Sequence, residues 1–289
     1  MKALRFGTKD VPGDRALVMA IVNRTRDSFY DRGRTFEVDA ATAAVDRAVA
    51  DGADIVDIGG VRAGAQGEHV DADEEARRVV PFVAAVRERH PGLVISVDTW
   101  RHQVARQVCE AGADLLNDTW AGADPGLAEV AAEFGVGVVC SHTGGLPPRT
   151  DPHRVRYADV VAEVAAELVE RAERMVRLGV PEHGVLIDPT HDFGKNTWHG
   201  LALLRRLDEL VATGWPVLMA LSNKDFIGET LGAEVDERLE GTLAATAVAA
   251  WSGARVFRAH HVAETRRVVE MVASIAGTRP PEQVLRALA

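Results

Sequence analysis

The sequence predicts an α/β fold, a single-domain (β/α)₈ barrel of the TIM type, and two observations carry this prediction. Short apolar runs rich in β-branched residues alternate with segments whose apolar residues recur at helical spacing. Eight such strand–helix pairs follow one another over 289 residues, which is the repeat of a parallel barrel. A doubly wound sheet of similar length is the alternative, but eight evenly spaced units favour closure.

The clearest βαβ unit spans residues 93–119. Residues 93–97 form an apolar run too short for a helix, and Asp98 ends it. Helical spacing then continues until Gly112, a residue suited to a helix C-cap. A second apolar strand begins at Asp114 and gives way to Asn117. Because the carboxyl ends of neighbouring parallel strands meet at one face, we expect Asp98 and Asn117 to point at the same opening.

The other elements repeat this unit in order along the chain. The predicted strands are 17–23, 54–60, 93–97, 114–116, 137–143, 185–190, 216–222 and 255–262. The predicted helices are 39–51, 71–90, the segment before Gly112, 125–134, 158–178, 201–213, 238–252 and 264–276. No Pro/Gly/Ser-rich linker divides the sequence, so one domain over residues 1–289 is expected.

Composition narrows the function classes. The chain has 33 Lys and Arg against 43 Asp and Glu, a formal charge of −10, which argues against nucleic acid or a membrane surface as partner. Residues 1–15 lack the apolar core of a signal peptide, and no apolar stretch is long enough to span a bilayer. Cys109 and Cys140 are expected to be small buried side chains in a reducing compartment, so a cytoplasmic location is predicted.

Polar side chains gather at the carboxyl ends of the predicted strands, whereas the opposite ends carry mostly Gly, Pro or single charges. This asymmetry predicts an active face at one mouth of the barrel. The strand-end residues are Asn23, Asp57, Asp98, Asn117, Ser141, His142, Asp188, Ser222, Lys224, Arg258 and His260.

Simpler explanations exist for single members of this set. Asp98 and Asp188 can cap the following helices, because Asp is a preferred N-cap. Asn117 can satisfy loop backbone, and Lys224 can lie on the solvated surface. Four such groups converging on one barrel mouth favour a site over four independent coincidences.

Histidines at the strand ends raise the alternative of a zinc site. The candidates are His142, His191, His260 and His261. Metal-dependent barrel hydrolases usually place a His-x-His pair after the first strand, where this chain has Asn23, Arg24 and Thr25. Zinc is therefore the weaker interpretation.

The strand-end set divides into two chemical halves. Buried carboxylates and amides (Asp98, Asn117, Asp188) suit a heterocycle whose N–H and C=O groups each need a partner. The cations, taken as Arg258, His260 and the arginines after the first strand, suit an anion such as phosphate. A nitrogen-rich heterocycle with a phosphate-type leaving group fits both halves.

The chain resembles the dihydropteroate synthase family of pterin-binding barrels, almost from end to end. The segments that carry the resemblance are MAIVNRTRDSF, DIVDIGG, ISVDTWR, GADLLNDTW, IDPTHDFGK, LSNKDFIGETLG, EGTLAATAVAAWSGA and FRAHHV. The resemblance implies a TIM barrel that joins 6-hydroxymethyl-7,8-dihydropterin pyrophosphate to p-aminobenzoate for folate synthesis, with Mg²⁺ and as a homodimer. Pyrophosphate leaves first in this chemistry, and the amine then captures the pterin methylene cation.

The resemblance also implies residue roles. The pterin pocket corresponds to Asp98, Asn117, Asp188 and Lys224. The pyrophosphate site corresponds to Asn23, Arg258 and His260, with Asn23 at the metal. The p-aminobenzoate site corresponds to Phe193, Ser222 and Lys224. The implied catalytic residues are Lys224, Asp98 and Arg258.

The sequence departs from the family mostly on the amine side. After the second strand the family usually has Gly-Gly-Glu-Ser-Thr-Arg-Pro-Gly. This chain has Gly59-Gly60-Val61-Arg62-Ala63-Gly64, which is two residues shorter and lacks the Thr and the Pro. In the first loop, Arg26 stands where the family usually has Pro, and Arg32 stands where it usually has Gly. Where the family usually has Gly-x-Gly, this chain has Thr190-His191-Asp192. Asn223 replaces the Arg of the usual Ser-Arg-Lys, and His261 replaces a usual Asp.

Three interpretations follow from these departures. The first is a working dihydropteroate synthase with unusual loops. The second is a divergent paralogue that binds pterin but synthesises weakly or joins another amine to it. The third is a non-catalytic pterin-binding protein or a pterin-dependent methyltransferase of the same barrel family. The pattern favours a dihydropteroate synthase or a near relative whose activity is weak or lost.

Overall fold

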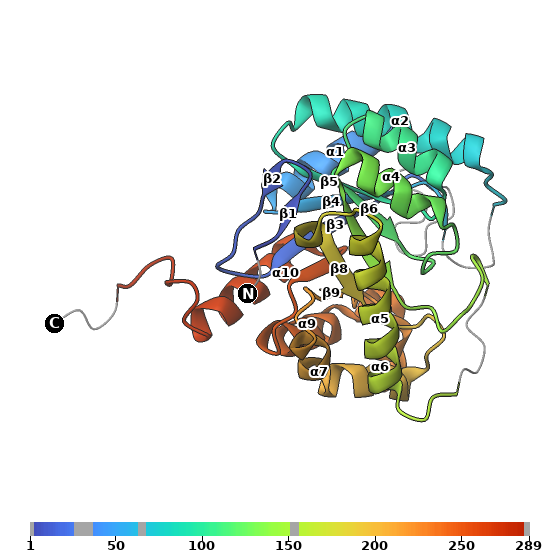
Figure 1. Ribbon diagram of the computed structural model, residues 1–289. Helices are drawn as coiled ribbons and strands as arrows, with labels where there is room; N and C mark the ends of the chain where they lie inside the picture. The colour runs from blue at the N-terminus through green and yellow to red at the C-terminus, as the bar shows by residue number, and fades with distance from the viewer. Residues whose placement is uncertain (1–2, 26–36, 63–67, 151–155, 286–289) are drawn as a thin grey trace.

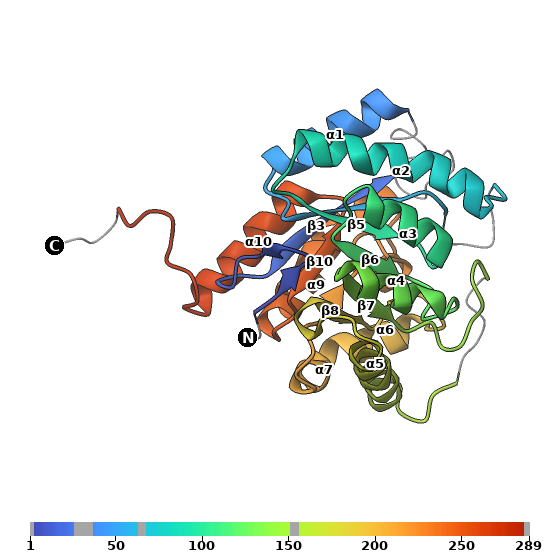
Figure 2. The ribbon, with the colours of Figure 1, turned by 45° about the horizontal axis from the view of Figure 1, so that its top comes forward.

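The computed structural model describes residues 3–25, 37–62, 68–150 and 156–285, and its centre is an eight-stranded parallel barrel (Figures 1 and 2). The strands are β3 (Leu17–Asn23), β4 (Ile55–Gly59), β5 (Val94–Asp98), β6 (Leu115–Asp118), β7 (Gly137–Ser141), β8 (Val185–Asp188), β9 (Leu218–Met219) and β10 (Val256–Ala259). Their hydrogen-bonded order is β8-β7-β6-β5-β4-β3-β10-β9. A bridge from Ile187 to Val217 joins the two ends, with the Ile187 amide donating to the Pro216 carbonyl at 3.0 Å. The predicted (β/α)₈ barrel is confirmed.

Helices surround the barrel (Figures 1 and 2). They are α1 (Val38–Ala50), α2 (Ala72–Arg89), α3 (His102–Glu110), α4 (Gly126–Phe134), α5 (Val160–Arg177), α6 (Thr197–Arg205), α7 (Leu207–Ala212), α8 (Asp225–Leu231), α9 (Leu239–Trp251) and α10 (Val262–Ile275), with 3₁₀ turns η1 (Glu182–Gly184) and η2 (Val235–Glu237). Within the described part of the chain, no helix combines the length and the apolar character needed to cross a bilayer.

Three of the differences from the predictions lie between β8 and α9. The predicted helix 201–213 begins earlier, at Thr197, because Asn196 and His199 form a capping box, and it breaks at Arg206 into α6 and α7. The predicted strand 216–222 is reduced to β9 because its pairing with β8 is limited to the single bridge. The sequence analysis missed α8, a seven-residue helix that ends at Gly232 in the left-handed conformation.

Alternation along the strands divides the core into two layers. In β3, Val18, Ala20 and Val22 belong to the cluster that packs against the helices, whereas Leu17 and Met19 belong to a second cluster that fills the barrel. A hairpin of β1 (Arg5–Phe6) and β2 (Lys9–Asp10) adds the fully buried Phe6 to this second cluster.

The same alternation makes the barrel interior apolar at one end and polar at the other. Leu17 and Met19 of β3 are followed on the inner face by Ile21 and Asn23, which line a cavity. Other strands repeat the sequence of an apolar inner residue followed by a polar one: Val94 then Asp98, Leu115 then Asn117, Leu186 then Asp188, and Val256 then Arg258. The apolar end therefore supports a polar site at the carboxyl ends of the strands.

Replacing Phe6 with Ala should lower the free energy of unfolding by ~3–5 kcal/mol, because it removes a fully buried ring from the barrel interior. Denaturant titration measures the change. Val38→Ala is the control, because Val38 is 52% exposed and should change stability by less than about 0.5 kcal/mol. Equal, small effects of the two substitutions would show that the hairpin does not support the barrel.

Candidate functional site

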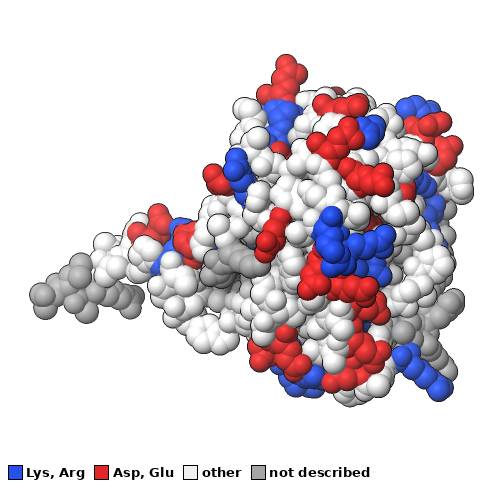
Figure 3. Space-filling view, viewed as in Figure 1, with Lys and Arg blue, Asp and Glu red and all other residues white. Residues whose placement is uncertain are grey.

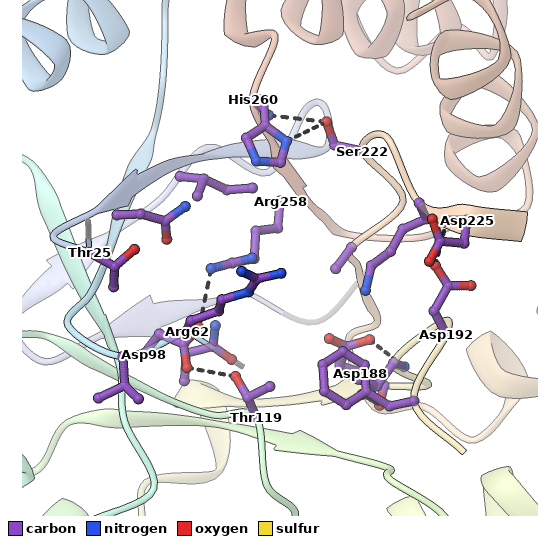
Figure 4. A pocket seen from close by; sticks show the side chains of 18 of the residues that line it. Thr25, Arg62, Asp98, Thr119, Asp188, Asp192, Ser222, Asp225, Arg258 and His260 are labelled. Atoms are coloured by element: carbon purple, nitrogen blue, oxygen red, sulfur yellow. Dashed lines mark hydrogen bonds and ion pairs between the residues drawn. The ribbon is translucent and has the colours of Figure 1, made fainter. Parts of the chain in front are cut away.

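A cavity of about 320 Å³ opens at the carboxyl ends of the strands (Figure 4). It brings together every residue that the sequence assigned to substrate or metal: Asn23, Asp98, Asn117, Asp188, Phe193, Ser222, Lys224, Arg258 and His260. They come from five barrel strands and from the loops that follow β8, β9 and β10. The two halves inferred from the sequence therefore face one space, and the role of each residue remains a prediction.

Asp57, in β4, holds several of these residues in place. Its side chain is completely buried, and its carboxylate accepts hydrogen bonds from Ser96 Oγ at 2.6 Å and Asn117 Nδ2 at 3.0 Å. The same carboxylate accepts from Arg258 Nε at 2.6 Å. Three donors from three strands thus converge on one buried anion, which fixes the Asn117 amide and the Arg258 guanidinium.

Asp98 shares Arg258 with Asp57. One Asp98 oxygen accepts from Thr119 Oγ1 at 2.7 Å (Figure 4), and the other accepts from Arg258 Nη2 at 3.2 Å. Burial, together with the neighbouring Asp57 charge, raises the pKa of Asp98 to about 7 against the opposing effects of Arg258 and Thr119. Asp98 can therefore gain or lose a proton near neutral pH.

Asp188 provides a second carboxylate in the lining. It accepts a hydrogen bond from the Thr190 amide at 2.7 Å. Burial raises its pKa to about 6, against the Thr190 hydrogen bond and the positive charges of Lys224, Lys195 and Arg258. This bond joins Asp188 to the loop that follows its own strand. Asp98 and Asp188 both line the cavity, and neither is the N-cap of the next helix, so the helix-capping interpretation is wrong for both.

His260 lies beside Ser222 (Figure 4). Its Nδ1 is 3.0 Å from Ser222 Oγ, and its backbone amide donates to the same oxygen at 3.2 Å. Burial, with the positive charge of Arg258, lowers the pKa of His260 to about 3. The sequence analysis took His260 as a cation, whereas this lowered pKa favours a neutral ring that meets an anion through a ring N–H.

Lys224 lies at the edge of the cavity next to Phe193. Its ammonium donates to the His191 carbonyl at 3.0 Å and lies 4.8 Å from the centre of the Phe193 ring. The Phe193 ring meets Trp120 edge-on at 5.3 Å. Lys224 is thus a cation held against an aromatic ring at the cavity. It is not a solvated surface lysine.

The loop after β8 forms part of the cavity wall through Thr190, Asp192 and Phe193. Thr190 and Asp192 adopt left-handed backbone conformations, with φ of 51° and 69°. Buried Lys195 ties this loop to β7, donating at 2.9 Å to the His142 carbonyl and at 2.9 Å to the Phe193 carbonyl. Burial lowers the pKa of Lys195 to about 7. The loop that departs from the family is therefore anchored at several points.

Sequence reasoning missed part of this site. Asp57 was recognised as a strand-end residue but not as the residue that organises the others, although a carboxylate inside an apolar strand is a detectable signal. Asp192 and Thr119 also line the cavity without having been assigned. Asn223 was expected beside the amine site, but its side chain is buried and absent from the lining. Three other departures, Arg26, Arg32 and Ala63, lie outside the described residues, as does Gly64.

The cavity lining offers few ligands for a metal ion. Among the residues that the structure describes, no three His, Cys, Asp or Glu side chains gather closely enough to hold an ion. His142 and His191 bond protein atoms instead, Lys195 Nζ at 2.9 Å and the Gly200 carbonyl at 3.2 Å. Mg²⁺ usually takes few protein oxygens and is held largely by substrate phosphates, and the Asn23 amide in the lining fits that limited role.

Comparisons with known proteins agree with this geometry. Residues 19–260 match the family described as "Pterin binding enzyme". An "Inactive dihydropteroate synthase 2" of Mycobacterium tuberculosis (strain ATCC 25618 / H37Rv) is 63% identical over 285 residues, covering 97% of this chain and 89% of that protein. A "Dihydropteroate synthase" of Escherichia coli (strain K12) is 38% identical over 260 residues, covering 89% and 92%.

A solved structure extends the likeness to three dimensions. The dihydropteroate synthase of Xanthomonas albilineans in complex with 7,8-dihydropteroate is 37% identical, with a TM-score of 0.83 over 95% of this chain and 98% of that one. The family match spans most of the chain, and the relatives cover nearly all of it. This chain therefore belongs to the pterin-binding enzyme family and resembles its dihydropteroate synthases in sequence and in fold.

Proposed function

We propose that this chain, as one domain over residues 1–289, binds 6-hydroxymethyl-7,8-dihydropterin pyrophosphate in the barrel cavity and releases pyrophosphate from it, but forms dihydropteroate weakly or not at all. The observation that carries the proposal is the convergence of Asp98, Asn117 and Asp188 on one cavity with Arg258 beside them. The Mycobacterium tuberculosis relative named inactive supports weak synthesis, and the Xanthomonas albilineans complex supports pterin chemistry in this barrel.

The pterin is assigned to the carboxylate and amide half. Asp98 and Asp188, once ionised, accept hydrogen bonds from ring N–H and amino groups, while the Asn117 amide can both donate and accept. Asp57 holds Asn117 in one orientation, so the pocket is arranged before the ligand arrives. Lys224, above Phe193, completes this pocket from the side of the second substrate. A desolvated heterocycle needs this complete set of partners.

The pyrophosphate is assigned to Asn23, Arg258 and His260. Arg258 presents a planar set of donors whose orientation is fixed by Asp57 and Asp98, and these donors stabilise the negative charge that develops as the C–O bond breaks. Neutral His260 adds a hydrogen-bond donor. The Asn23 side chain would hold Mg²⁺, which would supply further charge neutralisation to the leaving group.

The amine half is where we place the loss of activity. Phe193, Ser222 and Lys224 remain in the lining, but the loop after Gly60 is two residues short of the family pattern. A closing loop shields a reactive cation from water and positions the second substrate. With the shorter loop, water reaches the pterin cation and captures it.

The remaining assignments concern partners and location. Acidic and basic side chains are interspersed on the face shown in Figure 3, which supports small-molecule substrates rather than nucleic acid. We also propose a homodimer, because apolar side chains on the adjacent helices α9 and α10 are well exposed: Val248 53%, Trp251 63%, Met271 61% and Ile275 60%. The two buried cysteines form no disulfide, which supports a cytoplasmic location.

Asp98→Ala and Asp188→Ala should each weaken pterin binding by ~1–3 kcal/mol, because each leaves buried ligand groups without a partner. This corresponds to a roughly tenfold to hundredfold loss of affinity, measured by calorimetry with 6-hydroxymethylpterin. Affinity of the native protein should be greatest above pH about 7. It should fall as the pH drops through the pKa of Asp98, about 7, and that of Asp188, about 6, because protonated carboxyls lose acceptors. No native binding, or unchanged binding by both variants, would reject the pterin pocket.

Native protein given the pterin pyrophosphate, Mg²⁺ and p-aminobenzoate should release more pyrophosphate than it forms dihydropteroate. Replacing Val61-Arg62-Ala63, between Gly60 and Gly64, with Glu-Ser-Thr-Arg-Pro should raise the yield of dihydropteroate more than that of pyrophosphate, since it restores the two missing residues of the closing loop. The two products are followed separately. Restoring Arg at position 223 is not part of this test, because Asn223 is buried with a φ of 57°. One-to-one products at ordinary enzyme rates would refute the loop argument, and pterin binding without pyrophosphate release would identify a non-catalytic binder.

Trp251→Glu should convert the dimer to a monomer, because it places a charge in the apolar surface of α9 and α10. Analytical ultracentrifugation should show twice the mass of one chain for the native protein and a single chain for the variant. Val38→Glu, at an exposed position on α1, is the control and should leave the mass unchanged. A monomeric native protein would contradict the assignment.

A further inference from the structure

The loop that follows β8 is held through its backbone carbonyls by two lysines. Lys224, which lines the cavity, donates to the His191 carbonyl at 3.0 Å. Lys195 is buried and does not line the cavity. It donates to the Phe193 carbonyl at 2.9 Å and to the Thr190 carbonyl at 3.3 Å. The loop is therefore fixed by one ammonium at the cavity and by another outside it.

Further contacts fix the same loop against the chain that follows β7. Lys195 donates to the His142 carbonyl at 2.9 Å, and its Nζ lies 2.9 Å from Nδ1 of the same residue. The Tyr157 hydroxyl donates to the Gly194 carbonyl at 2.9 Å. Gly194 lies so close to its neighbour that a Cβ there would be 2.5 Å from the Thr143 carbonyl oxygen. The position of the loop is thus set by groups outside the cavity.

The side chain that depends most on this anchoring is Phe193. Its ring lines the cavity, meets Trp120 edge-on at 5.3 Å and lies 4.8 Å from the Lys224 ammonium. Its backbone carbonyl accepts from Lys195, so a shift of the loop at that bond moves the ring away from Lys224. Lys195 contributes no atom to the cavity lining and can act on a bound molecule only through such a shift.

Lys195 has more acceptors around it than N–H groups to donate. Four acceptors lie within 3.3 Å of its nitrogen, whereas an ammonium has three N–H groups. While Lys195 is charged, Nδ1 of His142 must accept, which leaves the ring proton on Nε2, 3.4 Å from a Glu167 oxygen. A neutral amine has only two N–H groups, so loss of the Lys195 proton weakens the anchoring of the loop.

The groups around Lys195 allow it to titrate near neutral pH. Burial lowers its pKa to about 7; the negative charge of Asp188 opposes this shift, and the positive charge of Lys224 adds to it. Glu167 and Asp192 also favour the charged form. The other titratable groups that face this region have pKa values that keep them uncharged at neutral pH, lowered for the three histidines and raised for the phenol: His142, His191, His199 and Tyr157.

We propose that Lys195 is the positioning residue of the second-substrate half: its ammonium, outside the cavity, holds the Phe193 ring beside Lys224 and thereby sets the affinity for the arylamine. The inference rests on the proposed function, which assigns Phe193 and Lys224 to that substrate. It makes the loop after β8 a determinant of amine binding that is independent of the shortened loop after Gly60.

Calorimetry of p-aminobenzoate with protein saturated with 6-hydroxymethylpterin and pyrophosphate tests the proposal. Lys195→Met keeps the length of the side chain but removes its donors. Near pH 6 it should weaken p-aminobenzoate binding about tenfold and pterin binding by less than about twofold, because only the amine half loses its support. Tyr157→Phe removes the bond to Gly194 alone and should weaken p-aminobenzoate binding about threefold.

The pH profile separates positioning by the ammonium from a general structural role. The ratio of native to Lys195→Met affinity for p-aminobenzoate should fall at least about threefold between about pH 6 and about pH 8.5, because deprotonation removes a donor from the native protein alone. Ionisation of the ligands and of the pterin half affects both proteins and cancels in this ratio. Tyr157→Phe keeps Lys195 and should keep the native profile.

Lys9→Met is the matched control. It removes a lysine that pairs with Asp114, the residue before β6, at the opposite end of the barrel from the cavity, and should leave both affinities and the pH profile unchanged. Equal losses of pterin and p-aminobenzoate affinity in Lys195→Met, a native-to-variant ratio that does not change with pH, or unchanged p-aminobenzoate binding would overturn the proposal. If Lys195→Met does not fold, the two affinities of Tyr157→Phe decide in the same way.

Pterin binding by the native protein is measured first, so its failure is read separately as failure of the proposed function. In that case the same p-aminobenzoate titrations, on protein without pterin, decide the role of Lys195. Native protein that binds no p-aminobenzoate under either condition would overturn the inference.

Discussion

The ion pair between fully buried Asp57 and partly exposed Arg258 is the interaction on which the site depends. Asp57 is inaccessible to solvent and receives hydrogen bonds from Arg258, Asn117 and Ser96. A buried pair contributes little net stability compared with apolar residues, but loss of one partner leaves an uncompensated charge and costs ~3–5 kcal/mol. What the pair does contribute is orientation: it fixes Arg258 against Asp98 and the Asn117 amide against the cavity. The pterin half and the anion half are therefore one hydrogen-bonded unit.

Burying these charged groups together costs free energy, and the apolar part of the barrel interior offsets that cost. The raised pKa values of Asp98 and Asp188 show that burial disfavours both carboxylates in their ionised form. Directly along the same strands, apolar inner residues such as Leu115 and Leu186 fill the barrel with no polar groups to satisfy. The stability gained by that apolar layer offsets the strain of holding charges at the mouth, before a ligand provides their partners.

The two sides of the cavity differ in how they relate to the family. On the pterin side, the residues implied by the resemblance all line the cavity. On the amine side, Thr190 and Asp192 stand where the resemblance implies glycines, and both have left-handed backbone. Lys195 holds this loop through the His142 and Phe193 carbonyls. An anchored loop of different sequence is a changed binding surface rather than a damaged one.

The sequence by itself determined the barrel, the end of the barrel that carries the cavity, and the strand-end residues that we assign to the pterin. It could do so because strand alternation and the position of polar residues at strand ends are local patterns. Only the tertiary structure decided which groups hold the others. Asp57 meets Arg258 across 201 residues, the lowered pKa of His260 follows from burial beside Arg258, and the Asn223 side chain is buried outside the cavity lining. The hydrogen bond from the Asp225 amide to Asp192 was equally invisible, because it comes from α8, a short helix that local periodicity did not reveal. Hydrogen bonds, desolvation and charge depend on which distant residues come within a few ångströms, and that is set by packing, not by the local pattern of the chain.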